Sequence, residues 1–322
     1  MSTEGPPLNE FGLPDGLIPF GGLSNCTLAL CPLETSVFQY QPSIPAQAII
    51  IVLFALSMLV HIWQGFRYKS WSFMICIVIG CVDECIGYGG RIIMHDNPFN
   101  FQAFLMQIIC ITTAPVFFCS SIYVLLSRTI NYLDPSLSRF NPKWFILTFI
   151  PSDILSLIFQ ATGGALSSVL TGDGQRKIGV NISIAGLVLQ VFTLVIFVGL
   201  FMDYVIRYHR KSGVASKIQV FLGFLFASIL FILIRSIFRI DELIDGYNGP
   251  LMHNQGLFIA LESVMVLIAV FCLHIAHPGL AFGKDGYRVT SANVNDSGSY
   301  LETADQDKVH QEKVHSTSGA SA

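Results

Sequence analysis

The sequence has few charged residues, and this shortage argues against a water-soluble fold. Asp, Glu, Lys and Arg make up 12% of the 322 residues, about half the share found in an average soluble domain. Hydrophobic residues instead reach 52% of the chain. This composition is typical of integral membrane proteins.

The sequence also lacks the motifs of several protein classes. It has no basic arm or RNA-binding motif and its net charge is −3, so we expect no nucleic-acid partner. It has no Gly-x-x-x-x-Gly-Lys-Ser/Thr loop, so we expect no nucleotide partner, and any transport would be passive or proton-coupled. The first 40 residues contain Pro, Asn and acidic residues rather than a basic start before an apolar run. We therefore expect the first apolar stretch to act as a signal anchor.

Long apolar stretches are what the sequence does contain, and each is close to the roughly 20 residues that cross about 30 Å of hydrocarbon. The seven stretches lie at about residues 46–66, 71–90, 103–126, 144–165, 179–202, 218–238 and 256–276. The predicted fold is all-α, a seven-helix transmembrane bundle over residues 46–280. An extracellular segment (1–45) precedes the bundle, and a polar, disordered cytoplasmic tail (281–322) follows it.

The short connections between these stretches predict the orientation of the chain, because cytoplasmic loops carry an excess of Lys and Arg. Alternate connections hold Arg67, Lys69, Arg128, Arg139, Lys143, Arg207, Arg210, Lys211 and Lys217. The opposite loops hold only Arg176 and Lys177 clear of the predicted helices, and the last of them is acidic around Asp241, Glu242 and Asp245. The N-terminus is therefore predicted outside and the C-terminus in the cytoplasm.

Two features of the N-terminal segment agree with an outside location. Asn25 begins an Asn-Cys-Thr glycosylation sequon. Cys26 and Cys31 are five residues apart, and in an oxidising compartment they either form a small disulfide loop or remain free thiols.

Charged residues inside the apolar stretches are the most informative feature of the chain. A charge at mid-bilayer costs roughly 2.5 kcal/mol or more, so it persists where it faces the bundle interior with a partner or a function. These residues are Asp83, Glu84, Arg91, Asp153, Arg235, Arg239 and Glu262.

In the second stretch, Glu84, Gly87, Tyr88 and Arg91 are spaced at i, i+3, i+4 and i+7, which places them on one helical face. Glycine on that face lets a neighbouring helix approach closely. The two charges are either part of a substrate pathway or an intramembrane ion pair that only orders helix packing.

In the fourth stretch, Asp153 and Gln160 are seven residues apart and share a face. At 1.5 Å per residue, Asp153 lies about 13 Å from the predicted cytoplasmic end, close to the midplane. It is a candidate for binding a proton or cation, or else for a hydrogen bond to a fifth-helix residue such as Gln190.

At the end of the sixth stretch, Arg235, Arg239 and Glu242 again follow helical spacing. Arginines near a helix end can extend to the interface, which applies more to Arg239 than to the deeper Arg235. Glu262 of the seventh stretch is the expected counter-charge. With Glu84 and Arg91 at similar depth, these residues predict one polar cluster.

The order of these motifs resembles that of a known family. The motifs are Glu-x-x-Gly-Tyr-x-x-Arg at 84–91, Ala114-Pro115 before Ser121-Ile122-Tyr123 and Arg128, Asp153 with Gln160-x-x-Gly-Gly, Arg235-x-x-x-Arg239-x-x-Glu242, and His277-Pro278-Gly279. Over residues 46–280 the chain resembles the fungal lipid-translocating exporters, which include sphingoid long-chain base exporters and resistance-to-aminocholesterol proteins.

This resemblance implies a non-enzymatic protein of the plasma membrane or an endomembrane that moves lipids across the bilayer and confers resistance to toxic amphiphiles. The expected partners are membrane lipids, above all cationic amphiphiles such as a protonated sphingoid base. Its ammonium group would pass through a polar crevice lined by acids while the chain stays in lipid, since a bare ammonium in hydrocarbon is very costly. No cofactor is expected.

Two other classes share parts of this pattern. A seven-helix zinc hydrolase would use His61, Asp203, His274 and His277, which lie toward the predicted cytoplasmic side, but Pro278 interrupts the last pair and we expect no metal. A seven-helix receptor or sensor would share the topology. The chain lacks the Asp-Arg-Tyr and Asn-Pro-x-x-Tyr types of motif, and its third stretch ends in Ser-Arg-Thr at 127–129.

Overall fold

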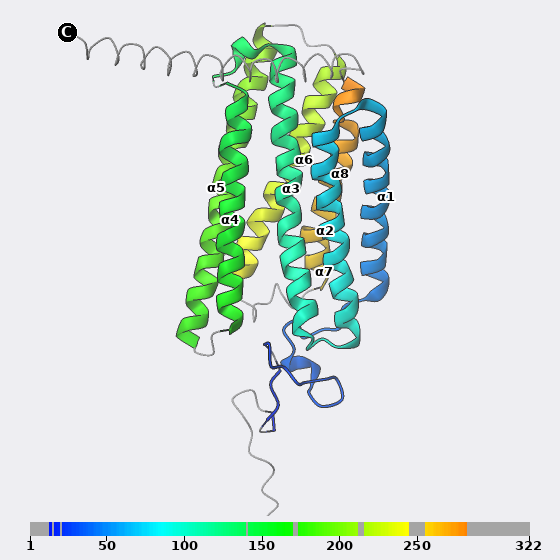
Figure 1. The fold of residues 1–322 in the computed structure, drawn as a ribbon, viewed down its shortest axis with the longest axis vertical. Coiled ribbons are helices and arrows are strands. Elements are labelled where there is room, and N and C mark those ends of the chain that lie inside the picture. Colours follow the sequence, from blue (N-terminus) through cyan, green and yellow to red (C-terminus); the bar gives the residue numbers. More distant parts are fainter. Residues whose placement is uncertain are drawn as a thin grey trace, which may run out of the picture.

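The computed structural model shows a bundle of long, roughly parallel helices (Figure 1). It describes residues 13–14, 16–19, 21–139, 141–169, 173–211, 216–244 and 255–281. The helical elements in these ranges are η1 (Leu33–Thr35), α1 (Ile44–Tyr68), α2 (Trp71–Asp96), α3 (Phe101–Leu133), η2 (Pro135–Leu137), α4 (Lys143–Val169), α5 (Asp173–Lys211), α6 (Ser216–Ile244), α7 (Gln255–Phe258), η3 (Ile259–Val264) and α8 (Met265–Ile275).

The predicted fold class is confirmed. In the described ranges, seven helical spans are long and apolar enough to cross a membrane, and no β-strand is present. The elements α7, η3 and α8 follow one another without a break and together form the seventh span, within which η3 is a π-helix. The protein is therefore a multi-pass membrane protein.

Most helices extend beyond the apolar stretches that predicted them. The second helix continues to Asp96 rather than residue 90, and α6 continues to Ile244 rather than residue 238. Apolar composition ends where hydrocarbon ends, whereas backbone hydrogen bonding can carry a helix on through the interface. Asp241 and Glu242 accordingly belong to α6 and Lys177 to α5, not to loops. The remaining acidic loop residue, Asp245, and the tail from 282 to 322 lie outside the described residues.

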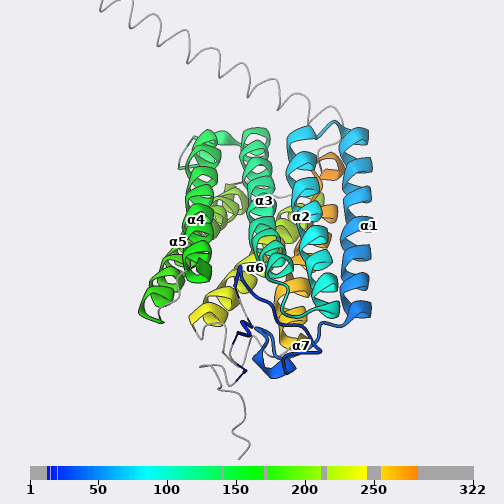
Figure 2. The ribbon, with the colours of Figure 1, turned by 60° about the horizontal axis from the view of Figure 1, so that its bottom comes forward.

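The helices pack mainly with their sequence neighbours. The pairs α1 with α2, α2 with α3, α4 with α5, and α6 with α8 make the largest interfaces. In Figure 2, α1 and α2 lie on one side of the bundle and α4 and α5 on the other, with α3 and α6 between them. The two central helices are in contact with each other, so side chains from α3 and α6 form the middle of the bundle.

Glycines explain the close approach of α4 and α5. A Cβ atom added at Gly163 would lie 2.4 Å from the Ser183 amide nitrogen, and one at Gly179 would lie 2.5 Å from the Ser167 amide nitrogen. Both distances are shorter than real Cβ contacts and involve backbone atoms that cannot move away. Gly164, by contrast, faces open space, with nothing within 4 Å of an added Cβ.

The neighbouring glycines give a matched test of this packing. Gly163→Ala should lower the free energy of unfolding by about 1–3 kcal/mol, because the added methyl group overpacks the α4–α5 interface. Gly164→Ala should be neutral or slightly stabilising, since alanine favours helix and meets no neighbour. Thermal unfolding of the purified variants in one detergent measures both. Equal melting temperatures for the two variants would contradict the packing account.

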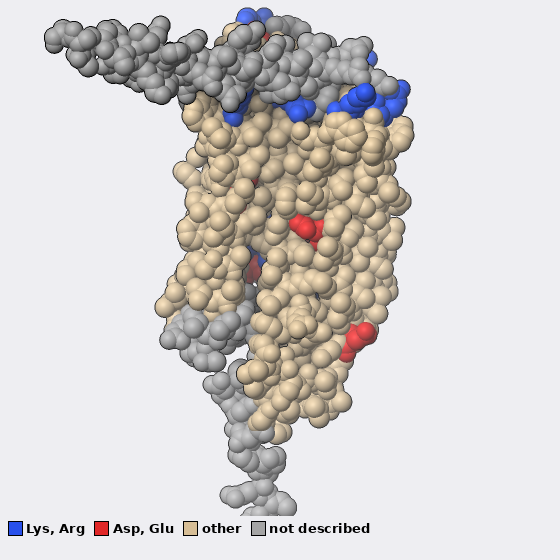
Figure 3. Space-filling model, viewed as in Figure 1, with Lys and Arg blue, Asp and Glu red and all other residues tan. Residues whose placement is uncertain are grey.

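Lys and Arg side chains gather at one end of the bundle (Figure 3), which we call the basic end. There Lys211 Nζ of α5 lies 2.7 Å from Asp134 Oδ2, just after α3. The Lys211 ammonium and the Ser136 hydroxyl lower the pKa of the Asp134 carboxyl to about 2. Arg139 Nε lies 2.9 Å from Asp203 Oδ2. These pairs connect the chain between α3 and α4 to the end of α5.

The N-terminal segment packs against the opposite end of the bundle. Phe38 is buried with Met94 of α2 and Phe104 of α3, and Gln41 Nε2 donates a 2.7 Å hydrogen bond to the His95 carbonyl. Cys26 and Cys31 form a disulfide. The described part of this segment is therefore an ordered cap on the bundle, which we call the N-terminal cap (residues 13–43).

Candidate functional site

A fully buried ion pair lies between α6 and the π-helix. Arg235 Nη2 donates to Glu262 Oε1, and both side chains are inaccessible to solvent. The same nitrogen donates a 2.8 Å hydrogen bond to the carbonyl of Ile111 on α3. Arg235 lies nine residues before the end of α6, about 14 Å along the helix, too deep to extend to the interface.

Arg239 and Glu242 continue this ion pair one turn further along α6. Arg239 Nη1 donates to Glu242 Oε2, its Nε lies 3.7 Å from Glu262 Oε1, and its Nη2 lies 3.4 Å from Thr112 Oγ1. We call Arg235, Arg239, Glu242 and Glu262 the charge cluster. Its two cations and two carboxylates balance formally, which is the condition under which buried charges are tolerated.

One carboxylate of the charge cluster comes from the π-helix η3. Both Glu262 and Ser263 belong to η3 and are buried. The Tyr88 hydroxyl of α2 donates a 2.6 Å hydrogen bond to Ser263 Oγ. Wide π-helical turns are rare and are frequently found at functional sites, so we include the turn that connects α2 to the cluster in the candidate site.

Glu84 is buried beside the cluster but is not joined to it. Its side chain is 1% exposed, and neither carboxylate oxygen has a hydrogen-bond partner among the described residues. Asp83, its neighbour on α2, is only half-buried. Of the two alternatives for Glu84, the ion pair has no cation within ion-pair distance among the described residues, and the substrate-pathway role stays a prediction.

Arg91 also differs from its predicted surroundings. Within the described residues no carboxylate lies within ion-pair distance of it. Instead Arg91 Nη2 donates to the Tyr40 hydroxyl of the N-terminal cap. The guanidinium carbon lies 4.1 Å from the ring centre of Phe258 and 5.0 Å from that of Phe38, both within cation–π range. The expected single cluster thus excludes Arg91, because aromatic rings rather than acids surround it.

Asp153 and Gln160 form a second polar group, between α3, α4 and α5. Asp153 is 1% exposed, and its two oxygens accept hydrogen bonds from Tyr123 at 2.9 Å and Thr193 at 3.4 Å. The expected partner Gln190 bonds to Gln160 instead, with Gln160 Nε2 donating to Gln190 Oε1 at 3.1 Å. Asp153 and Gln160 therefore share α4 but have different partners.

A cavity of about 370 Å³ opens between α3 and α4. Its wall consists of Phe101, Phe104, Leu105, Ile108, Ile109, Thr112 and Thr113 of α3, Leu157, Gln160, Ala161, Gly164 and Ala165 of α4, Ser183 and Leu187 of α5, and Arg239 and Leu243 of α6. Ile109 on its rim is 54% exposed. Figure 3 shows the opening on the side of the bundle, with acidic and basic atoms visible inside. In a membrane this opening faces lipid.

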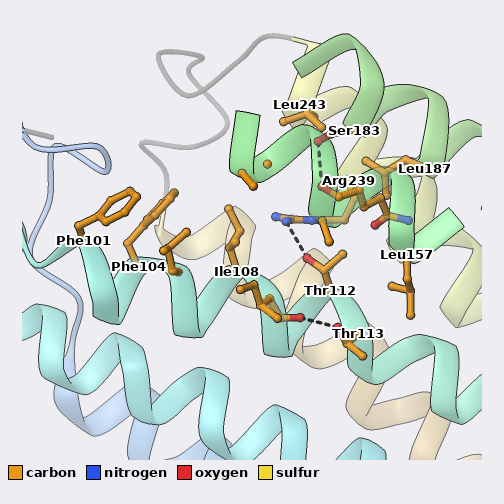
Figure 4. Close-up of a pocket in the computed structure, with 16 residues that line it drawn as sticks. Phe101, Phe104, Ile108, Thr112, Thr113, Leu157, Ser183, Leu187, Arg239 and Leu243 are labelled. Atoms are coloured by element: carbon orange, nitrogen blue, oxygen red, sulfur yellow. Dashed lines mark hydrogen bonds between the residues drawn. The ribbon is translucent and has the colours of Figure 1, made fainter. Parts of the chain in front are cut away.

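Most residues of the cavity wall are apolar, and a few polar side chains, among them Arg239, Thr112 and Gln160, also line it. Figure 4 shows Phe101 and Phe104 at one end, and Arg239 directed at Thr112 across the space. Arg239 is the member of the charge cluster that lines the wall, and Gln160 of the second polar group lines it as well. The cavity thus connects the two groups of predicted site residues, a relation that their sequence positions do not show.

The histidines expected of a zinc hydrolase are near one another but are not arranged as a metal site. The rings of His61 and His274 stack with centroids 3.8 Å apart, and His277 Nε2 lies 3.1 Å from Ser70 Oγ. Asp203 instead binds Arg139 and Arg207. Among the described residues, no three His, Cys, Asp or Glu side chains are grouped to hold a metal ion.

Several residues of the site were not identified from the sequence. Phe38 and Tyr40 lie in the predicted extracellular segment, and their aromatic character just before the first span was the available signal. Thr112 and Thr193 are single hydroxyl residues in apolar helices, and nothing in the sequence separates them from other threonines.

Comparisons with known proteins identify the family of this chain and several relatives. The model of the RTA1 like protein family matches residues 77–285. The sphingoid long-chain base transporter RSB1 of Saccharomyces cerevisiae is 31% identical over 279 residues, which covers 75% of this chain and 73% of the relative. Protoporphyrin uptake protein 1 of the same species is 28% identical over 64% of this chain and 67% of the relative. Protein RTM1 from the same species is 27% identical over 62% of this chain and 66% of the relative. No solved structure matches the chain significantly.

Proposed function

The chain belongs to the family of RTA1-like proteins, and we propose on this basis that it moves amphiphilic lipids across the membrane, with sphingoid long-chain bases as the substrate class. The relative at 31% identity is named a transporter of such bases. We place the protein in the plasma membrane or an endomembrane, and we expect the activity to be transport rather than catalysis.

The cavity between α3 and α4 is the observation that carries this proposal. Its volume of about 370 Å³ falls in the range of ligand pockets, about 300–1,000 Å³. Its opening lies on the side of the bundle, where a lipid can enter without leaving the membrane. Apolar walls suit the hydrocarbon chain, while Gln160, Thr112 and Arg239 supply polar groups for the head.

The charge cluster suits the passage of a protonated amine. An unsolvated ammonium is very costly in hydrocarbon, so a crossing head group needs oxygen atoms that accept its hydrogens. Glu242 Oε1 and Glu262 Oε2 are buried and have no hydrogen-bond partner among the described residues. Both carboxylates bind Arg239, so we propose that a substrate ammonium approaches them by displacing this guanidinium. The movement would be passive or proton-coupled.

Blocking the cavity tests the proposal. Gly164 lines the cavity and an added Cβ there meets nothing within 4 Å, so Gly164→Phe should place a ring in the space and reduce sphingoid-base transfer nearly to the protein-free background. The matched control is Gly199→Phe, because Gly199 of α5 is exposed, has equally open surroundings and does not line the cavity.

The measurement uses purified protein in liposomes, with fluorescent sphingoid base, fatty acid and phospholipid compared side by side. Wild-type protein and the Gly199→Phe control should transfer the sphingoid base faster than protein-free vesicles. Unchanged transfer by folded Gly164→Phe protein would show that the substrate does not use this cavity.

We also propose that the basic end faces the cytoplasm and the N-terminal cap lies outside. Asn25 should then be glycosylated, since its side chain is exposed. Its Nδ2 donates to the Gly16 carbonyl at 2.8 Å, and a glycosylated amide keeps one N–H for this bond. Endoglycosidase treatment should shift the wild-type band on a gel but not that of Asn25→Gln. Resistance of a C-terminal tag to protease added from the cytosolic side would contradict this orientation.

A further inference from the structure

Gln160 lines the cavity and has a buried side-chain oxygen with no hydrogen-bond partner among the described residues. The side chain is 9% exposed and lines the cavity between α3 and α4. Its Nε2 donates to Gln190 Oε1 at 3.1 Å, but its Oε1 has no partner among the described residues. Most buried side-chain polar atoms in proteins are paired, so this oxygen requires an explanation.

Several other polar side chains on the wall already have hydrogen-bond partners in the protein. Ser183 Oγ donates to the Gln160 backbone carbonyl at 3.1 Å, and Thr113 Oγ1 donates to the Ile109 carbonyl at 2.8 Å. Arg239 is bound to Glu242 and Thr112. Gln160 Oε1 thus belongs to a wall residue and has no partner among the described residues, although the atom itself is shielded from solvent. Arg239, the cationic group of the wall, is neutralised by Glu242 and Glu262.

We propose that the Gln160 side chain turns toward the cavity and that its Oε1 recognises the lipid head group by accepting a hydrogen bond from its ammonium or hydroxyl group. This inference rests on the proposed function and adds its head-group specificity. A sphingoid base carries an amine and hydroxyl groups, which supply N–H and O–H donors. The ionised carboxylate of a fatty acid supplies only acceptors, so it cannot bind this oxygen. The cavity should accordingly prefer donor-bearing head groups over carboxylates on chains of equal length.

The test replaces the acceptor while keeping the side-chain length. Gln160→Met removes the carbonyl oxygen, and Gln190→Met is its matched control. The control breaks the same hydrogen bond between α4 and α5, yet Gln190 does not line the cavity. A third variant, Gln160→Glu, keeps an acceptor and adds a negative charge at the same place.

Equilibrium binding to the full-length proteins in liposomes is measured with fluorescent sphingoid base, alkyl amine, alkyl diol and fatty acid of matched chain length. Comparing the alkyl amine with the alkyl diol shows whether Gln160 accepts from the N–H or the O–H groups of the head. Gln160→Met should bind the sphingoid base about tenfold more weakly, the effect of losing one hydrogen bond to a charged group, with fatty-acid binding unchanged. Gln190→Met should keep the wild-type preference for sphingoid base over fatty acid. Gln160→Glu should strengthen this preference.

Two results would overturn the inference while leaving the proposed function intact. One is a Gln160→Met protein that transports sphingoid base and keeps the wild-type preference over fatty acid. The other is a Gln190→Met protein with the same loss as Gln160→Met, which would assign the effect to helix packing. Wild-type protein that neither binds nor transports any of the four amphiphiles would instead refute the proposed function, and this inference with it.

Discussion

Arg235→Met is expected to lower the free energy of unfolding by about 3–5 kcal/mol, the usual cost of removing one partner from a buried ion pair. The substitution leaves Glu262 without its fully buried counter-charge and frees the Ile111 carbonyl. Arg239 Nε, 3.7 Å from Glu262 Oε1, compensates only in part, because the same guanidinium also pairs with Glu242. Thermal unfolding in detergent should show a much lower melting temperature and reduced yield.

An exposed ion pair and a double substitution are the controls for Arg235. Arg139→Met removes a partner of Asp203, but the Arg139 side chain is 58% exposed, and exposed pairs contribute about 0–1 kcal/mol. The double variant Arg235→Met with Glu262→Met removes both charges and should recover much of the loss, since apolar replacements of buried pairs are often neutral. Equal stability of Arg235→Met and Arg139→Met would contradict a structural role for the charge cluster.

Asp153→Asn is expected to fold normally but to transport sphingoid base at a rate that no longer depends on pH. Asparagine matches the geometry of the site, because its Oδ1 can accept from Tyr123 and its Nδ2 can donate to Thr193 Oγ1. What it cannot do is gain and lose a proton. If transport is proton-coupled through this residue, the flat profile appears in a liposome assay across the range from about pH 5 to 8.

The control for Asp153 keeps the carboxylate and removes its neighbour's hydroxyl. Tyr123→Phe should retain a pH-dependent rate, since Asp153 and its contact with Thr193 remain. Membrane levels of both variants are compared first. A normal pH profile in Asp153→Asn would show that Asp153 serves only as a hydrogen-bond acceptor for helix packing, and proton coupling through it would have to be abandoned.

Hydropathy predicted the helices correctly but not their lengths. A stretch rich in Leu, Ile, Val and Phe reports burial in hydrocarbon, and so it located all seven spans. The ends of α5 and α6 are polar, and there the helix is held by backbone hydrogen bonds that composition does not report. This is why Lys177 and Asp241 were expected in loops and are helical.

Helical spacing predicted which helix faces are buried, but it predicted only some of the interaction partners of the charged residues on them. The sequence pointed to Glu262 as the counter-charge of Arg235, which is how the structure pairs them. It did not predict that Arg91 would lie among Phe38, Tyr40 and Phe258. Those aromatic residues come from the N-terminal cap and the seventh span, far from Arg91 in the chain.

By itself, the sequence determined that this protein lies in a membrane, that it is a seven-helix bundle, and which faces of α2, α4 and α6 carry polar residues. These properties follow from composition and from a period of 3.6 residues, which act over a few turns of one helix. Tertiary structure alone decided the cavity between α3 and α4, the π-helical turn at Glu262 and the buried Gln160 oxygen that has no partner among the described residues. Each depends on how closely helices distant in sequence approach one another, and no local pattern contains that distance.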